Sequence, residues 1–124
     1  MNSNRRAILS VPVITLLLSL AGYGQSSISA TDAKNHIGEK ATVCGKVAGT
    51  LYAAGSLDDP TFINLAKPYP DQVFKIVIWG RDRDKFGKPE QDYRGKRMCV
   101  TGEIAAFKGI PQIVATDPSQ ISIQ

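Results

Sequence analysis

The sequence predicts a mostly β domain, an antiparallel barrel or sandwich of five strands with short helices. Two segments alternate between apolar and polar residues, Lys40–Gly49 and Lys96–Phe107, as half-buried strands do. A third segment, Val73–Trp79, is short and almost continuously apolar, which is typical of a more deeply buried strand. Turn-rich connections such as Thr50–Pro60 separate the strands, and this arrangement favours a small all-β architecture.

The N-terminus has the layout of a secretory signal peptide. Arg5 and Arg6 precede an apolar run, Ala7–Leu20, and small residues follow it. We expect cleavage after Gly24, with Ala21 as the alternative position. The alternative of an uncleaved membrane anchor is less favoured because the apolar run is short for a full span. No cysteine stands near the cleavage region, which argues against a lipid-anchored lipoprotein.

We therefore expect an exported protein, periplasmic or secreted, that has no membrane attachment after cleavage. The predicted division is a signal peptide over residues 1–24, an N-terminal segment with a short helix over 25–37, and a β domain over 38–124. The 15 basic residues of the whole chain include Arg5 and Arg6, so 13 remain against 11 acidic ones, a net charge of about +2. This mild charge is only weak evidence for a polyanionic partner.

The N-terminal segment carries the signals of one short helix, predicted over Thr31–Ile37. Ser29 or Thr31 can cap its first turn, and Gly38 suits its C-terminal end. His36 lies away from the apolar side of this helix, and we interpret it as a surface residue.

The β domain follows in a regular order. The charged segment Arg81–Gly95 is predicted to form a loop with one helical turn before Gly87, and Asp117–Gln124 closes the chain. The predicted strands are Lys40–Gly49, Thr61–Lys67, Val73–Trp79, Lys96–Phe107 and Ile110–Thr116.

The only two cysteines occupy equivalent positions in two of these strands. Alternation places Cys44 and Cys99 on the sides of their strands that face away from the core. Two cysteines in an exported protein usually form a disulfide, and side chains directly opposite on antiparallel neighbours are close enough to do so. Two free buried thiols remain the main alternative. A redox-active pair is disfavoured because there is no C-x-x-C spacing, and a metal site is disfavoured because only one histidine is present.

The strand order resembles that of the OB-fold, with "VCGKV", "TFINL", "FKIVIWG", "YRGKRMCVTGEI" and "IPQIV" as its strand segments. More narrowly, the chain looks like the nucleic-acid-binding OB domains of anticodon-binding and nuclease-associated type, over about Gly38–Ile121. The hairpin Phe107–Ile113 is among the best-matching parts. The resemblance implies a five-stranded barrel whose first and fourth strands are antiparallel neighbours, which would bring the two cysteines together. Alternation places Gly45 and Gly102 on the inward sides of their strands, and the resemblance implies a reason, because a strongly coiled barrel strand has no room for a side chain there.

The resemblance also implies a ligand face on the second and third strands and their flanking loops. Phe62 resembles the stacking aromatic of anticodon-binding OB domains. The residues expected to bind nucleic acid are Tyr52 in the first flanking loop, Phe62 and Asn64 on the second strand, Lys75 and Trp79 on the third, Arg81 and Arg83 after it, and Phe107 and Lys108 in the second flanking loop.

Each of these assignments has a structural alternative. A one-residue slip in strand phase would bury Phe62 and Trp79 in the core. The alternating charges of Arg81–Lys85 are typical of a solvated loop that compensates its own charges, and Asp58 and Asp59 weaken the case for a polyanion.

The sequence favours a binding module over an enzyme. His36 is the only histidine, which leaves no pattern for a Ser-His-Asp triad, and there is no Gly-rich phosphate loop. We expect no cofactor and no metal. The predicted function is binding of single-stranded DNA or RNA with weak sequence preference. The alternative is an exported OB domain that binds a protein or an oligosaccharide, or that has a structural role in the envelope.

Overall fold

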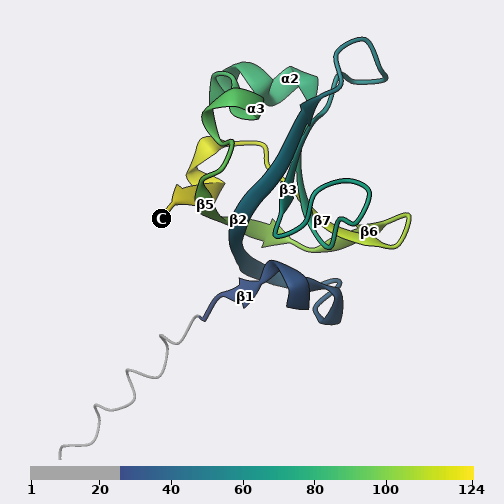
Figure 1. Cartoon of the computed structure of the whole chain (residues 1–124), viewed down its shortest axis with the longest axis vertical. Helices are drawn as coiled ribbons and strands as arrows, with labels where there is room; N and C mark the ends of the chain where they lie inside the picture. The colour runs from purple at the N-terminus through teal and green to yellow at the C-terminus, as the bar shows by residue number, and fades with distance from the viewer. Residues whose placement is uncertain (1–25) are drawn as a thin grey trace, which may run out of the picture.

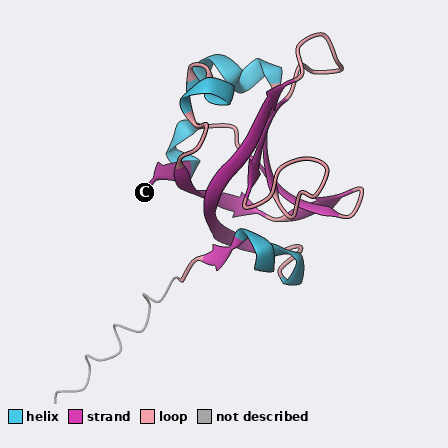
Figure 2. Cartoon of the chain, in the orientation of Figure 1, coloured by secondary structure: helices cyan, strands magenta, loops and turns pink. Residues whose placement is uncertain are grey.

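The computed structural model describes residues 26–124, so the predicted signal peptide lies outside the described residues. Within 26–124 no helix is long and apolar enough to cross a membrane. The fold is mostly β, with short helical turns between the strands (Figures 1 and 2). Its elements are β1 (Ile28–Ser29), η2 (Ala30–Asn35), β2 (Lys40–Tyr52), β3 (Thr61–Leu65), β4 (Lys75–Ile78), α2 (Gly80–Arg83), η3 (Asp84–Phe86), α3 (Pro89–Asp92), β5 (Arg97–Glu103), β6 (Ala105–Phe107), β7 (Ile110–Val114), η4 (Pro118–Gln120) and β8 (Ile121–Ile123).

The long, curved strand β2 organises the sheet. Its first half pairs antiparallel with β5 and its second half pairs antiparallel with β3, with a register shift between Val47 and Gly49 where the strand changes partner. Figure 1 shows α2 and α3 at one end of β2 and η2 near the other. The strand order is β6-β7-β4-β3-β2-β5-β8, with β4 and β7 parallel and with β1 added to β2.

The sheet has eight strands and is not closed, whereas the sequence led us to expect a five-stranded barrel. Strands β5 and β7 approach each other through side chains and do not form a hydrogen-bonded ladder. A Cβ placed on Gly102 of β5 would lie 2.7 Å from Cγ2 of Ile113 on β7. This close approach explains why a residue without a side chain stands at Gly102, on the inward side of its strand as predicted.

The core confirms the predicted strand phases. Val43 and Val47 of β2 are buried, and Met98, Val100 and Ile104 from the fourth predicted strand are fully buried. The other large buried residues come from the central strands and their connections: Ile63, Leu65, Phe74, Ile76, Ile78 and Ile113.

Several element boundaries differ from the prediction. The first helix is a 3-10 helix that ends at Asn35, and the Ser29 hydroxyl accepts a hydrogen bond from the Asp32 N–H at its start. Strand β2 continues three residues past Gly49 to Tyr52, and the charged segment forms two helical turns and a 3-10 turn. Strands β1 and β8 were not predicted, because strands of two or three residues are too short to show an alternating pattern.

Cys44 and Cys99 form the predicted disulfide. They are Cα partners in the β2–β5 ladder and lie 55 residues apart in the sequence. No free cysteine remains, so the alternative of two free thiols is wrong.

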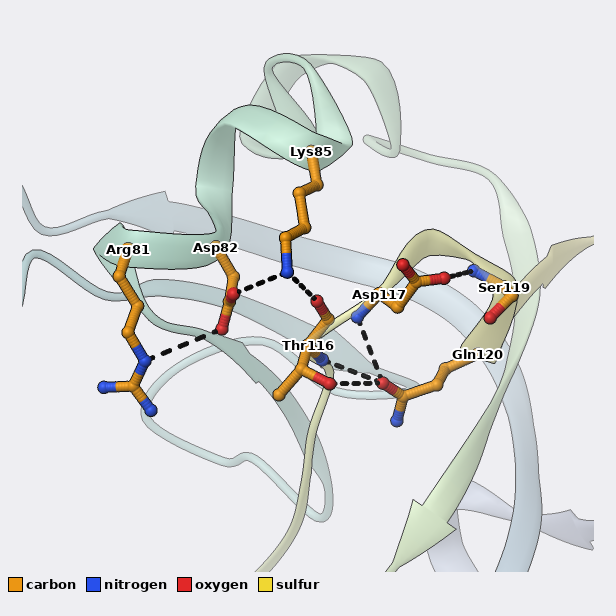
Figure 3. Close-up of polar contacts among 7 residues, drawn as sticks. All are labelled: Arg81, Asp82, Lys85, Thr116, Asp117, Ser119 and Gln120. Carbon is orange, nitrogen blue, oxygen red and sulfur yellow. Dashed lines mark hydrogen bonds and ion pairs between the residues drawn. The ribbon is translucent and has the colours of Figure 1, made fainter.

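A polar network holds the α2–η3 segment against the connection between β7 and β8 (Figure 3). Lys85 donates to the buried Asp82 carboxylate at 3.0 Å and to the Thr116 carbonyl at 3.2 Å. The Gln120 side chain accepts from the Thr116 N–H at 2.8 Å and donates to the Thr101 carbonyl of β5. These contacts join three segments at the open side of the sheet, where the backbone ladder is missing.

Candidate functional site

Two aromatic rings and two lysines gather on one side of the sheet. The ammonium nitrogen of Lys75 lies 4.8 Å from the ring centroid of Phe62 and 5.4 Å from that of Phe107. The ammonium nitrogen of Lys108 lies 5.5 Å from the Phe107 centroid. We call Phe62, Lys75, Phe107 and Lys108 the aromatic–lysine cluster. Cation–π contacts of this kind are worth about 0.5–1 kcal/mol at exposed sites.

Strand pairing brings these residues together from distant parts of the sequence. Lys75 of β4 is the Cα partner of Asn64 on β3 and of Gln112 on β7, so these three side chains form one row across the sheet. The hairpin of β6 and β7 then places Phe107 beside this row. Its two-residue turn has positive φ at both Lys108 (52°) and Gly109 (79°), the conformation that keeps tight hairpins in register with strand twist.

The lysine at the centre of the cluster is electrostatically perturbed. Partial burial between the two rings lowers the pKa of Lys75, and the positive charge of Lys108 lowers it further. A group with this environment gains from an approaching anion, because the anion offsets both the lost hydration and the repulsion between the two ammonium groups.

A side pocket of about 420 Å³ adjoins the cluster and shares Phe62 and Lys75 with it. No carboxylate lines it, and Lys75 is its only charged residue. Leu51 and Tyr69 stand at its edge with 57 % and 77 % of their surface exposed. The pocket is therefore apolar and aromatic with one cation, a composition that suits an anionic ligand with flat rings. Its lining residues are Gly49, Thr50, Leu51, Phe62, Asn64, Pro68, Tyr69, Gln72 and Lys75.

Asn64 contributes an unsatisfied polar group to this pocket. Its side chain is only 6 % exposed, and Oδ1 has no hydrogen-bond partner within residues 26–124. Buried amide oxygens nearly always have a partner, and leaving one without a partner costs about 1–3 kcal/mol. Thr61 Oγ1 and Arg83 Nε are also buried without a partner, but of the three residues only Asn64 lines the pocket, so its oxygen is the one that a ligand in the pocket could reach.

Tyr52 and Arg83 do not belong to this face, which corrects the sequence-based assignment. Tyr52 ends β2 opposite the fully buried Thr61, so it lies on the other side of the sheet from Phe62. The Arg83 guanidinium lies 3.8 Å from the Tyr52 ring centroid and donates two hydrogen bonds to the Glu90 carboxylate, at 2.9 and 2.7 Å. Arg83 thus joins α2 to α3 and to β2, which is a structural role.

Trp79 and Arg81 occupy intermediate positions. Trp79 is half-buried at the start of α2 and does not line the side pocket. Arg81 is exposed beside Asp82, with 3.9 Å between Nε and the carboxylate. Lys85 pairs with Asp82, and Arg83 pairs with Glu90. These ion pairs agree with the alternative interpretation from the sequence, in which the charged segment neutralises its own charges.

Four residues at or beside the site were not identified from the sequence. Pro68, Tyr69 and Gln72 lie in the loop between β3 and β4 and line the pocket, and Gln112 of β7 lies beside Lys75 in the sheet. An available signal was Tyr69 itself, an aromatic residue flanked by two prolines in a loop that joins the two strands of the proposed face.

Known structures with a similar fold include small binding domains. The chain is similar to OBody AM1L10 bound to hen egg-white lysozyme, with a TM-score of 0.55 and 18 % identity over 82 % of this chain and 96 % of that one. OBody AM2EP06 bound to hen egg-white lysozyme gives a TM-score of 0.54 and 16 % identity over 82 % and 94 % of the two chains. A putative aspartyl-tRNA synthetase from Leishmania major Friedlin gives 0.50 and 9 % identity, over 82 % of this chain and 21 % of that one.

The chain has an OB-like β fold. No family model matches the sequence, and a search of curated proteins found no significant match. At these identities the likeness extends to the fold alone, and the function has to be argued from the site. Within residues 26–124 no group of three or more His, Cys, Asp or Glu side chains is arranged to hold a metal ion.

Proposed function

We propose that this protein is an OB-like binding module for single-stranded nucleic acid, with the aromatic–lysine cluster and the side pocket as its ligand site. One observation carries the proposal: two aromatic rings on a partly open face flank a lysine whose pKa is lowered. Single-strand binding needs flat faces for bases and cations for phosphates, and this cluster offers both.

Binding would exchange one set of contacts for another. In the free protein the Lys75 ammonium lies over both rings. A phosphate draws the ammonium away, and a base then stacks on the ring that it leaves. Each stacked base contributes about 1–3 kcal/mol, more than the cation–π contact of about 0.5–1 kcal/mol that it replaces. Stacking accepts every base, so the cluster alone gives weak sequence preference.

Export belongs to the same proposal. The Cys44–Cys99 disulfide supports it, because such bonds persist in oxidising compartments. We further propose that the protein acts by binding alone, without catalysis, cofactor or metal.

A titration tests the proposal. A fluorescently labelled single strand of about 12 nucleotides, DNA or RNA, is titrated with the protein at low and moderate salt. We expect binding that weakens as salt rises and that falls at least tenfold in both Phe62→Ala and Phe107→Ala, since about 1.4 kcal/mol corresponds to a factor of ten. Leu57→Ala is the matched control, because Leu57 is an exposed apolar residue in the loop before β3 and does not line the pocket. Absence of binding at low salt, or equal binding by all three variants, would overturn the proposal.

A protein ligand is the second candidate, and one observation favours it. Leu51, Tyr69 and Phe107 are large and more than half exposed around the same site. Exposed apolar groups gathered in this way are typical of protein-interaction surfaces. The OBody structures show that a domain with this fold can hold a protein ligand. Binding that is insensitive to salt would favour this candidate.

A further inference from the structure

A second group of cations lies outside the proposed site, at the junction of β2 and β5. Lys46 and Arg97 are Cα partners in the antiparallel ladder, and both are exposed. Lys96 precedes Arg97 at the same end of the ladder, where its backbone carbonyl accepts the Val47 N–H at 2.8 Å, and its side chain is exposed. Lys67 follows Ala66, whose N–H donates to the Lys46 carbonyl at 2.8 Å. We call Lys46, Lys67, Lys96 and Arg97 the basic strip.

No carboxylate neutralises this strip. None of its four cations forms an ion pair with any acidic group in the described part of the chain. The lysines and arginines that do form ion pairs within residues 26–124 are Arg81, Arg83 and Lys85, which all lie in the charged segment after β4. At the far end of the same ladder, Lys40 stands opposite an acidic residue, Glu103. The β2–β5 ladder thus has one opposite-charge pair at one end and the like-charge pair Lys46 and Arg97 at the other.

The disulfide holds this unfavourable pair in place. Like charges directly opposite on neighbouring strands are destabilising. Cys44 and Cys99 lie two residues along the same ladder from Lys46 and Arg97, and they point to the same side of the sheet. The covalent link fixes the strand register, so the two cations cannot separate by slippage. An anion bound between Lys46 and Arg97 would offset their mutual repulsion, which would explain why both cations stand beside the disulfide.

The basic strip continues from the side pocket. Lys67 directly precedes Pro68, which lines the pocket, and Lys46 lies on the strand whose residues Gly49 and Leu51 form the pocket wall. Asp71 is the acidic residue of the same loop, and it forms no ion pair with the strip. A polyanion that leaves the pocket on this side meets the cations of the strip where β2 changes its pairing from β3 to β5.

We propose that the basic strip binds the phosphate backbone of the same single strand, beyond the bases held at the aromatic–lysine cluster. This inference rests on the proposed function and extends it. The strand would run from the β3–β4 face, past the loop between β3 and β4, onto the outer side of β2 and β5. The two parts then differ in character, because the cluster stacks bases whereas the strip contacts phosphates alone.

The test compares strand lengths and charge variants. Oligothymidylates of about 4 and about 16 nucleotides, the limits of typical OB-fold site sizes, are titrated with wild type, Lys46→Glu and Lys46→Gln. We expect both variants to bind the long strand several-fold more weakly and with a log–log salt slope lower by about 1, and to bind the short strand as wild type does. We also expect Lys46→Glu to unfold at a higher temperature than wild type, because it turns a like-charge pair into an opposite-charge pair.

Lys34→Glu is the charge-matched control. Lys34 is exposed in η2, and the turn after η2 bonds to Ile104 at the opposite end of β5 from Arg97. A loss in Lys34→Glu equal to that in Lys46→Glu would mean that only net charge matters, which would overturn the inference. Wild-type binding of both strands with no effect of either Lys46 variant would overturn the inference and leave the proposed function standing. No binding of either strand by the wild type would overturn both.

Discussion

The Lys75 ammonium lies 4.8 Å from the Phe62 ring centroid, on the face where β3 and β4 pair. One side chain thereby joins an aromatic surface to a positive charge, and the β6–β7 hairpin adds Phe107 on its other side. The pKa of Lys75 is lowered, first by partial burial and second by Lys108. This perturbation gives the site a measurable pH dependence.

Polyanion affinity should fall as the pH rises through the lowered pKa of Lys75, below the pH at which an ordinary lysine loses its proton. Lys75 loses its proton at a lower pH than an ordinary lysine, and a bound anion favours the charged form, so binding above this pKa requires uptake of a proton. Anisotropy titrations of a labelled single strand at a series of pH values measure this effect. Lys75→Arg keeps the charge throughout the range and should flatten the profile, whereas an identical profile in wild type and Lys75→Arg would contradict this role.

Removal of the disulfide should destabilise the domain strongly. It closes a loop of 55 residues, for which the chain-entropy model gives about 4 kcal/mol. Urea denaturation of Cys44→Ser/Cys99→Ser against oxidised wild type measures the loss. The reduced wild type serves as control, because it keeps both side chains without the bond. A loss below about 1 kcal/mol would contradict a structural role for the bond.

Substitution of Gly102, where β5 packs against β7, should lower the free energy of unfolding. A Cβ at Gly102 would lie 2.7 Å from Cγ2 of Ile113, so Gly102→Ala must displace a buried side chain. We expect a loss of about 1–3 kcal/mol in the free energy of unfolding. Gly45→Ala is the matched control on the neighbouring strand, where the closest atoms lie at 3.3 Å, and it should cost less. Equal stability of Gly102→Ala and wild type would show that β5 and β7 are not tightly packed at this position.

Replacement of Asn64 should affect stability and ligand binding in opposite directions. Asn64→Leu removes a buried oxygen that has no partner, so we expect stability equal to or above that of wild type, by up to about 1–3 kcal/mol. If the amide contacts ligand, the same variant binds a single strand several-fold more weakly. Thermal unfolding and a binding titration of the same variant give both quantities. A destabilised variant with unchanged affinity would assign Asn64 to the fold instead of the site.

The strand core could be predicted from the sequence because alternation has a direct physical cause. Successive side chains of a strand point to opposite faces, so the inward positions of Val43 and Val100 and the outward positions of the two cysteines followed from the pattern. The same reasoning placed Asn64 and Lys75 on one face of neighbouring strands, which the register confirms.

Long-range contacts were not predictable in the same way. The proximity of Phe107 to Lys75 depends on the parallel pairing of β4 with β7, and no local pattern encodes that pairing. Tyr52 was assigned to a loop because turn-forming residues follow it, but β2 extends through it and turns it towards Arg83. The sheet also stays open between β5 and β7, where the strands pack without a hydrogen-bonded ladder. Alternation within a single strand carries no information about such packing between strands.

The most direct test of the central claim is to map a bound single strand on the protein by NMR. A ¹⁵N-labelled sample is titrated with an oligothymidylate of about 12 nucleotides at low salt, and backbone amide shifts are followed. We predict the largest shifts at Phe62, Asn64, Lys75 and the turn after Phe107, with small shifts around Tyr52 and Arg83 on the other side of the sheet. The absence of shifts, or shifts confined to the Tyr52 side, would contradict the claim that the aromatic–lysine cluster binds single-stranded nucleic acid.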